Sequence, residues 1–274
     1  MSRFTTSDGL ELYYEDTGDG LPLLCLAGLT RNARDFDFVA PHLDGVRMIR
    51  LDYRGRGQSD WAEDWTTYAL PIEARDIFEL LAHLSLEKVA VLGTSRGGLN
   101  AFGMAATAPD ALLGVALNDV GPDIDTGGVA AIMTYLGRRP TATSHAELAQ
   151  AMSAIQTDLK DVPLERWEKL ARDNYPETST GLALSYDPKL RDATALMIEK
   201  PALDLWPFFD ALPNTPLTVI WGENSNLLKE PTVREMQRRR PDLILGRVPG
   251  RGHVPFLDEP ESLAALGRWL EAMK

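Results

Sequence analysis

The sequence predicts an α/β protein in which helices cover both faces of a mostly parallel sheet, with a helical insertion in the second half of the chain. Short apolar runs alternate with amphipathic stretches, which is typical of a parallel sheet. The stretch 121–207 interrupts this alternation and has a helical pattern throughout. The length of 274 residues is enough for one large domain with a full core.

The predicted strands are short apolar runs bounded by turn residues. The first, Leu10–Tyr14, alternates apolar and polar side chains and is followed by the turn Thr17–Gly20, so we expect antiparallel pairing there. The later runs are continuously apolar, as in strands that are buried on both faces. They are Pro22–Leu26, Arg47–Leu51, Lys88–Leu92, Leu113–Leu117, Leu217–Trp221 and Leu243–Val248.

The helices between these strands are predicted over Tyr68–Leu84, Gly97–Thr107, Pro231–Arg239 and Glu261–Met273. Residues 1–120 and 208–274 would form the core, and residues 121–207 would form a helical cap, because a structureless loop of that length is rare. The aromatic side chains of the cap are expected mainly in its own packing.

The composition argues against several partners. The chain has 28 Lys and Arg against 40 Asp and Glu, a net charge of −12, which disfavours nucleic acid and anionic membrane surfaces. The only cysteine, Cys25, lies in an apolar run and predicts a buried thiol without a disulfide. The first residues lack the apolar core of a signal peptide and no apolar run reaches membrane-spanning length, so we expect a cytoplasmic protein.

A G-x-S-x-G motif, Gly93–Gly97, stands between the predicted strand Lys88–Leu92 and a predicted helix. In this strand–turn–helix setting the motif forms a tight, strained turn that exposes its serine. The helix that follows directs N-terminal N–H groups toward the serine, which favours developing negative charge. We therefore predict that Ser95 is a nucleophile; the alternative is a glycine-rich turn with an incidental serine.

The chain resembles the α/β-hydrolase fold family along nearly its whole length. Besides the serine motif, Leu26–Thr30 resembles the family's oxyanion loop, Asp52–Ser59 its D-x-R-G-x-G-x-S turn, and Gly250–Phe256 the loop of its catalytic histidine. Within the family, the chain is most similar to 3-oxoadipate enol-lactonase-like and C–C-hydrolase-like esterases. The resemblance implies a mostly parallel eight-stranded sheet flanked by helices, an inserted helical cap and a serine hydrolase.

A serine nucleophile needs an adjacent base at neutral pH, and the chain has four histidines. His42 and His83 fall in amphipathic helical segments and are expected to be structural, and His145 falls in the predicted cap. His253 lies in a glycine-framed loop after the strand Leu243–Val248 and follows the serine in the family's chain order. We predict that His253 is the base; the alternative is a histidine in a surface loop.

The acid of the triad is where the sequence departs from the family pattern. After the strand Leu217–Trp221 the family commonly has an aspartate, whereas this chain has Glu223 followed by Asn224–Asn226. Some relatives place the acid one strand earlier, and here Leu113–Leu117 leads to Asp119. We predict Asp119 as the acid, with Glu223 second and an asparagine-assisted site third. Asp119 could instead cap the bend that follows it.

The resemblance also implies an oxyanion hole formed by the backbone N–H groups of Leu29 and Arg96. Arg31 and Arg34 follow Leu29 in the chain and Arg96 follows Ser95, and an arginine can bind a carboxylate through two parallel hydrogen bonds. In an acidic protein these arginines favour a substrate that carries a carboxylate; the alternative is salt bridging with nearby aspartates.

Together these features predict a serine hydrolase that cleaves a carboxylic ester or lactone of a small substrate through an acyl-enzyme on Ser95. The same fold could instead perform C–C bond hydrolysis, acyl transfer or a lyase reaction. A non-catalytic small-molecule receptor is the third interpretation; the presence of Ser95 and His253 argues against it, and the missing aspartate near Asn226 argues slightly for it. We expect no metal, no organic cofactor, and no nucleic-acid or membrane partner.

Overall fold

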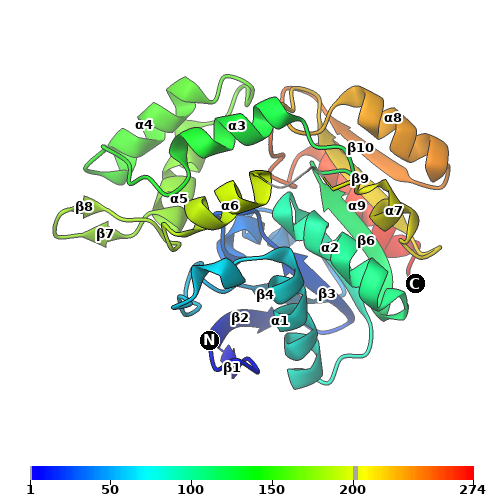
Figure 1. The fold of residues 1–274 in the computed structure, drawn as a ribbon. Helices are drawn as coiled ribbons and strands as arrows, with labels where there is room; N and C mark the ends of the chain where they lie inside the picture. Colours follow the sequence, from blue (N-terminus) through cyan, green and yellow to red (C-terminus); the bar gives the residue numbers. More distant parts are fainter. Residues whose placement is uncertain (1, 200–202) are drawn as a thin grey trace.

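The computed structural model describes residues 2–199 and 203–274, and its centre is an eight-stranded sheet (Figure 1). The sheet strands are β1 (Ser2–Thr5), β2 (Glu11–Thr17), β3 (Leu21–Leu26), β4 (Val46–Leu51), β5 (Val89–Thr94), β6 (Leu112–Asn118), β9 (Leu217–Gly222) and β10 (Ile244–Val248). Their order is β1-β2-β4-β3-β5-β6-β9-β10. β2 pairs antiparallel with β1 and β4, and all the other neighbours are parallel.

The helices form two groups. Around the sheet lie α1 (Leu70–His83), α2 (Arg96–Thr107), α7 (Trp206–Asp210), α8 (Glu230–Arg239) and α9 (Pro260–Glu271). The helices of the insertion are α3 (Thr126–Tyr135), α4 (His145–Ile155), α5 (Leu164–Asn174) and α6 (Leu190–Ile198), joined by the small hairpin of β7 (Glu177–Thr178) and β8 (Gly181–Leu182).

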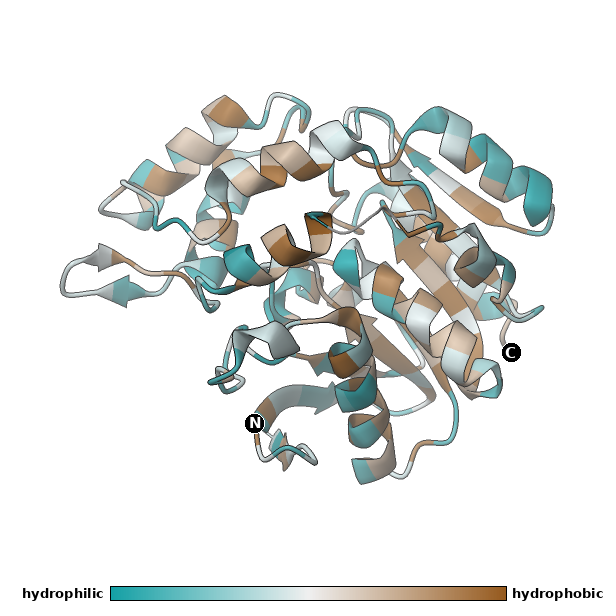
Figure 2. Cartoon of the chain, viewed as in Figure 1, coloured by the Kyte–Doolittle hydropathy of each residue, from teal (hydrophilic) through white to brown (hydrophobic). Residues whose placement is uncertain are grey.

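Apolar side chains cover both faces of the sheet, as a parallel sheet requires. On one face, side chains of alternate strand positions pack against α1, α2, α7 and α8. On the other face, the intervening positions pack against α9, and Cys25 is buried among them. The central strands are accordingly brown in Figure 2, while the outer surface of α8 is largely teal. The predicted architecture, a mostly parallel sheet between two helical layers, is confirmed.

The predicted elements match the observed ones within one to three residues at most ends. The clearest addition is β1, which is only four residues long and carries too short a pattern to be predicted. Its pairing with β2 extends the sheet at the antiparallel edge.

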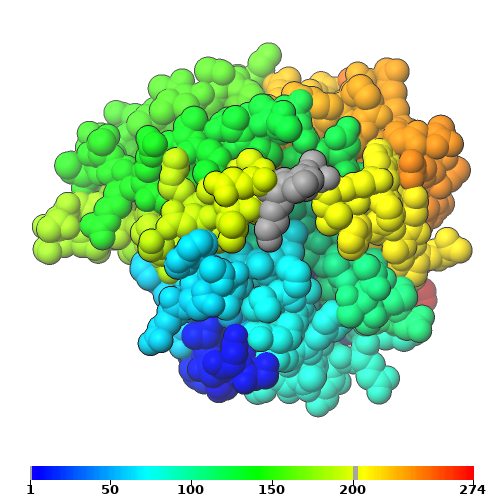
Figure 3. Space-filling view, viewed as in Figure 1, coloured from blue at the N-terminus to red at the C-terminus, as the bar shows by residue number. Residues whose placement is uncertain are grey.

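The insertion lies over the core, where it is the green and yellow-green layer of Figure 3. Trp167 is buried in its packing together with Leu159 and Leu170. The last two residues of the predicted cap segment, Trp206 and Pro207, belong to α7, which packs on α2 and is therefore part of the core. Within the two described ranges, we find no helix that is long and apolar enough to cross a membrane.

Candidate active site

Ser95 occupies a strained turn between β5 and α2. Its backbone has φ 50° and ψ −111°, a conformation that L-residues rarely adopt. The turn can form because glycines flank it: a Cβ on Gly97 would lie 2.0 Å from the carbonyl oxygen of Leu26, and one on Gly93 would lie 2.5 Å from the backbone of Gly97. The sequence thus forces the serine hydroxyl into the open at the carboxyl end of the sheet.

Three side chains from distant parts of the chain form a continuous hydrogen-bonded chain at this edge. Nε2 of His253 lies 3.0 Å from Oγ of Ser95, and Nδ1 of His253 lies 2.7 Å from Oδ2 of Asp119. Residues 95 and 119 follow neighbouring parallel strands, β5 and β6, and His253 follows β10. The structure therefore brings together the three residues that the sequence singled out, in the geometry of a serine–histidine–acid triad.

The carboxylate of Asp119 is fully buried and held by further donors. Its Oδ1 accepts a hydrogen bond of 2.9 Å from the backbone N–H of Gly222, and its Oδ2 accepts one of 2.6 Å from the hydroxyl of Ser225. The residue has a positive φ of 54°, which aspartate tolerates better than most residues. These contacts fix the carboxylate toward the imidazole and compensate its burial.

Glu223, the second candidate for the acid, has a different partner. Its carboxylate pairs with the guanidinium of Arg247 on the neighbouring strand β10. The hydrogen bond to Nδ1 of His253 comes from Asp119 and not from Glu223. Ser225 lies within the segment Asn224–Asn226, and no pattern in the sequence indicates that it donates to Asp119.

The loop that carries His253 is held by hydrogen bonds to the side chain of Glu259. Its two carboxylate oxygens accept hydrogen bonds from the backbone N–H groups of Phe256 and Leu257, at 2.9 and 3.0 Å. The same side chain accepts a hydrogen bond of 2.9 Å from Nε of Arg251. A buried carboxylate thus replaces the regular backbone pairing that this irregular segment lacks.

The cap also contacts the histidine loop. Arg166 of α5 forms a two-pronged ion pair with Asp258, at 2.7 and 2.6 Å. The backbone N–H of Lys160 donates to the carbonyl of Gly250 at 2.9 Å. A Cβ on Gly252 would collide with the carboxylate of Asp158, so this glycine allows the close approach of cap and loop.

The predicted oxyanion donors belong to segments that lie close to the serine. Arg96 is the first residue of α2, so its N–H has no acceptor within the helix. Leu29 follows Gly28, where an added Cβ would lie 3.9 Å from Cβ of Ser95. The segment after Leu29 is tied to the turn that follows β4, because Asp52 accepts hydrogen bonds from the N–H groups of Ala33 and Gln58, at 2.6 and 2.8 Å.

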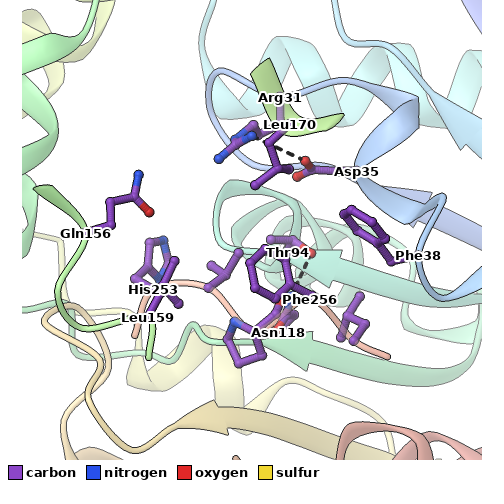
Figure 4. A pocket seen from close by; sticks show the side chains of 13 residues that line it. Arg31, Asp35, Phe38, Thr94, Asn118, Gln156, Leu159, Leu170, His253 and Phe256 are labelled. Atoms are coloured by element: carbon purple, nitrogen blue, oxygen red, sulfur yellow. Dashed lines mark hydrogen bonds and ion pairs between the residues drawn. The ribbon is translucent and has the colours of Figure 1, made fainter. Parts of the chain in front are cut away.

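A small cavity lies beside the histidine, between the core and the cap (Figure 4). It measures about 40 Å³, room for roughly three water molecules. Its lining includes Arg31 and Asp35 at one end, His253 at another, and the apolar side chains of Phe38 and Phe256. The cavity is therefore large enough for one small polar group of a ligand and too small for a whole substrate.

Arg31 is the predicted substrate-binding residue that lines this cavity. Its ion pair with Asp35 is long, at 3.8 Å, and about a quarter of its side chain is exposed. Burial by itself would lower the pKa of Arg31, but the charge of Asp35 raises it above its usual value. Burial raises the pKa of Asp35, which is also repelled by Asp173. A permanently charged guanidinium with a loosely held partner can bind a second carboxylate.

The other two arginines are engaged elsewhere. The guanidinium of Arg34 lies outside the cavity lining and pairs with Asp173 at 3.0 Å and with Asp37 at 3.5 Å. The side chain of Arg96 is buried against Glu73 at 2.7 Å. Of the three, Arg31 is the one that lines the cavity together with His253.

Of the remaining histidines, His42 is exposed at the end of the three-residue 3-10 helix Ala40–His42, which corrects the expectation of an amphipathic helix there. His83 and His145 contact other groups of the protein. The ring of His83 stacks on Phe4 and lies 3.2 Å from the hydroxyl of Tyr14. The ring of His145, at the start of α4, lies 2.7 Å from the carbonyl of Tyr175 within the cap. His253 is the histidine that meets the serine.

Comparison with known proteins shows which family the chain belongs to. The chain matches the model of the alpha/beta hydrolase fold over residues 22–260. It therefore belongs to the α/β-hydrolase fold family and is a hydrolase, which confirms the resemblance noted from its sequence.

The chain is similar to several individual hydrolases. The chain is 35% identical over 263 residues to a 3-hydroxybutyrate-oligomer hydrolase of Cupriavidus necator, covering 92% of this chain and 89% of that protein. It is 28% identical over 278 residues to a 2-(acetamidomethylene)succinate hydrolase of Mesorhizobium japonicum, covering 99% and 96%. A crystal structure of an alpha/beta hydrolase from Novosphingobium aromaticivorans superposes with a TM-score of 0.91 at 38% identity, covering 99% and 97%. Hydrolases of esters are thus among its relatives.

Proposed function

We propose that this hydrolase is a serine esterase that cleaves a small carboxylic ester or lactone through an acyl-enzyme on Ser95. The observation that carries the proposal is the unbroken hydrogen-bonded chain from Ser95 through His253 to Asp119, with distances of 3.0 and 2.7 Å. Each residue has the chemical character that its position requires: a hydroxyl, an imidazole and a buried carboxylate.

The reaction follows from this arrangement. Nε2 of His253 accepts the proton of Ser95 while Oγ attacks the ester carbonyl, and the C–O double bond becomes a single bond to an oxyanion. The backbone N–H groups of Leu29 and Arg96 would stabilise that oxyanion. Collapse expels the alcohol, which takes the proton from His253. Water then attacks the acyl-enzyme by the same steps and releases the acid.

Asp119 orients the imidazole and stabilises its cationic form during both halves of the reaction. Because Gly222 and Ser225 also donate to this carboxylate, it cannot turn away from Nδ1 without breaking two hydrogen bonds. The support of the acid therefore comes from the strand after which the family commonly carries the acid itself.

The proposed substrate is an ester of a short hydroxy acid that retains a free carboxylate. Arg31 lies in the small cavity next to His253, and the size of the cavity suits a carboxylate group. The likeness to a 3-hydroxybutyrate-oligomer hydrolase supports the same class, because such an oligomer is a chain of esters with a carboxylate at one end.

A substrate panel tests the proposal. The purified protein is assayed with the linear dimer of 3-hydroxybutyrate, with the methyl ester of that dimer, and with p-nitrophenyl butyrate, and a fluorophosphonate probe is mapped by peptide mass. We expect labelling of Ser95, turnover of all three esters, and the highest kcat/KM for the dimer with the free carboxylate. Absence of labelling would refute the serine mechanism, and preference for the methyl ester would refute the carboxylate requirement.

A further inference from the structure

A buried carboxylate, Glu73 on α1, lies behind the candidate active site and is not part of the triad. Its side chain is entirely buried. Oε2 accepts hydrogen bonds from Nε of Arg96 at 2.7 Å and from Nδ2 of Asn100 at 3.1 Å. Oε1 forms an ion pair with Nη2 of Arg56 at 2.9 Å. One carboxylate therefore holds two buried guanidinium groups together.

Each of the two arginines is linked to one of the two proposed oxyanion donors. Arg96 directly follows the nucleophile, and its own N–H is one of the proposed donors. Arg56 donates from Nε to the carbonyl oxygen of Leu29 at 3.0 Å, and the N–H of Leu29 is the other proposed donor. The two donors come from segments 67 positions apart in sequence, and Glu73 is the carboxylate that both arginines share.

We infer that Glu73 is a positioning residue that sets the distance between the two oxyanion donors; this inference rests on the proposed serine mechanism. The negative charge of Glu73 between the two positively charged arginines explains this role. Burial alone would raise the pKa of Glu73, but the neighbouring Arg96 and Arg56 hold it at about 2, so the carboxylate is charged at neutral pH. Without that charge, the two buried guanidinium groups would repel each other, Arg96 would lose the charged acceptor of its 2.7 Å hydrogen bond, and Arg56 would lose its ion-pair partner.

Loss of the Glu73 contacts would displace the oxyanion donors through the backbone of Leu29 and of α2. If Arg56 withdraws, the carbonyl of Leu29 loses its donor, and if Arg96 shifts, the first turn of α2 shifts with it. An oxyanion hole acts through donors that already point to where the charge develops. Displacement of either donor should thus weaken binding of the tetrahedral state much more than binding of the substrate.

The same helix offers a matched control. Asp76 lies one turn after Glu73, is equally buried, and also binds two arginines, Arg54 at 2.6 and 2.8 Å and Arg75 at 2.9 Å. Among the described residues, neither of those side chains forms a hydrogen bond or an ion pair with Leu29 or with the start of α2. Glu73→Gln and Asp76→Asn each remove one buried negative charge from α1, but only the first disconnects the oxyanion donors.

The test compares kcat, KM and melting temperature with the inhibition constant of a trifluoromethyl ketone. Ser95 adds to this ketone, His253 takes the proton, and the product is a hemiketal oxyanion that occupies the hole. For Glu73→Gln we expect kcat to fall about 100-fold, as when one oxyanion donor is lost, with KM within about threefold and ketone affinity reduced by a similar factor to kcat. Asp76→Asn should keep both values within about threefold.

The outcomes separate this inference from the proposed mechanism. If the wild-type protein does not bind the ketone, the serine mechanism itself is wrong. If Glu73→Gln binds the ketone as tightly as wild type, or if Asp76→Asn loses as much ketone affinity, the positioning role is wrong. Should Glu73→Gln fail to fold, Arg56→Lys tests the same link, because it keeps the charge and removes the Nε donor to Leu29; unchanged ketone affinity there would refute the inference.

Discussion

The hydroxyl of Ser225 donates a 2.6 Å hydrogen bond to Oδ2 of Asp119, the same oxygen that binds Nδ1 of His253. Ser225 stands in the segment after β9 where many relatives carry the acid, whereas Asp119 follows β6. Strands β6 and β9 are neighbours in the sheet, so their carboxyl ends deliver side chains to the same place. The segment after β9 thus supports the carboxylate of Asp119, which we propose as the acid of the triad.

Replacement of the acid should reduce the chemical step. Asp119→Asn should lower kcat by roughly 10³- to 10⁴-fold, because an amide cannot stabilise the imidazolium as a carboxylate does. The matched variant Glu223→Gln should change kcat by no more than about twofold, since that carboxylate pairs with Arg247 at the surface. Steady-state kinetics of both variants on one ester decide the matter; a larger loss in Glu223→Gln would mean that the acid is misassigned.

Removal of the supporting hydroxyl should affect both activity and stability. Oγ of Ser225 also accepts hydrogen bonds from the N–H groups of Leu227 and Leu228, at 3.1 and 3.0 Å. Ser225→Ala leaves these donors without an acceptor, at a cost of about 1–3 kcal/mol, so the melting temperature should fall by several degrees. Because the variant also loses the hydrogen bond from Ser225 to Asp119, the carboxylate of Asp119 is less constrained, and kcat should drop roughly tenfold. Calorimetry and kinetics measure the two effects; an unchanged melting temperature would contradict the first.

The nucleophile should be dispensable for folding. Ser95→Ala removes one oxygen atom from a position with a positive φ, and we expect kcat to fall by about 10⁴-fold or more while the melting temperature stays within a few degrees of wild type. Kinetics on p-nitrophenyl butyrate and a thermal scan are sufficient. Near-normal turnover by the purified variant would exclude Ser95 as the nucleophile.

Arg31 and Arg34 allow the carboxylate site to be tested with a close control. Arg31→Met should raise KM for the 3-hydroxybutyrate dimer about tenfold or more, and leave KM for its methyl ester within about twofold, because only the free acid uses the guanidinium. Arg34→Met should leave both values near wild type, since Arg34 pairs with Asp173 outside the cavity. Equal effects of Arg31→Met on the two substrates would indicate a general packing role.

The ion pairs of Glu73 predict a specific acid dependence of stability. The pKa of this group is about 2 in the folded protein and 4.5 in its ordinary state. A lowered pKa stabilises the folded state above about pH 4.5, and that contribution is lost as the pH falls toward 2. Glu73→Gln should thus melt below wild type at pH 7, and the difference should shrink as the pH falls below about 4.5. Thermal scans across this range measure it; a constant difference would contradict the assignment.

The sequence was sufficient for the fold because buried parallel strands read as continuous apolar runs, which local composition reveals. Ser95 and His253 were predictable because each lies in a motif whose glycines serve local backbone needs, such as the contact of Gly97 with Leu26. The position of Asp119 followed from the order of the strands. Contacts between distant side chains left no such trace: the pairing of Arg34 with Asp173 and the donor role of Ser225 depend on packing.

The contacts between the cap and the loop of His253 determine what a deletion of the cap would do to this protein. Removal of residues 121–207 would take away Arg166, whose guanidinium pairs with Asp258 and lies over the rings of Phe38 and Phe256. The rings of Phe38 and Phe256 would be exposed to water, and the loop that carries His253 would lose its contacts with the cap. We therefore expect that the insertion helps to hold the loop of His253 in place, alongside the hydrogen bonds that Glu259 and Asp119 of the core provide.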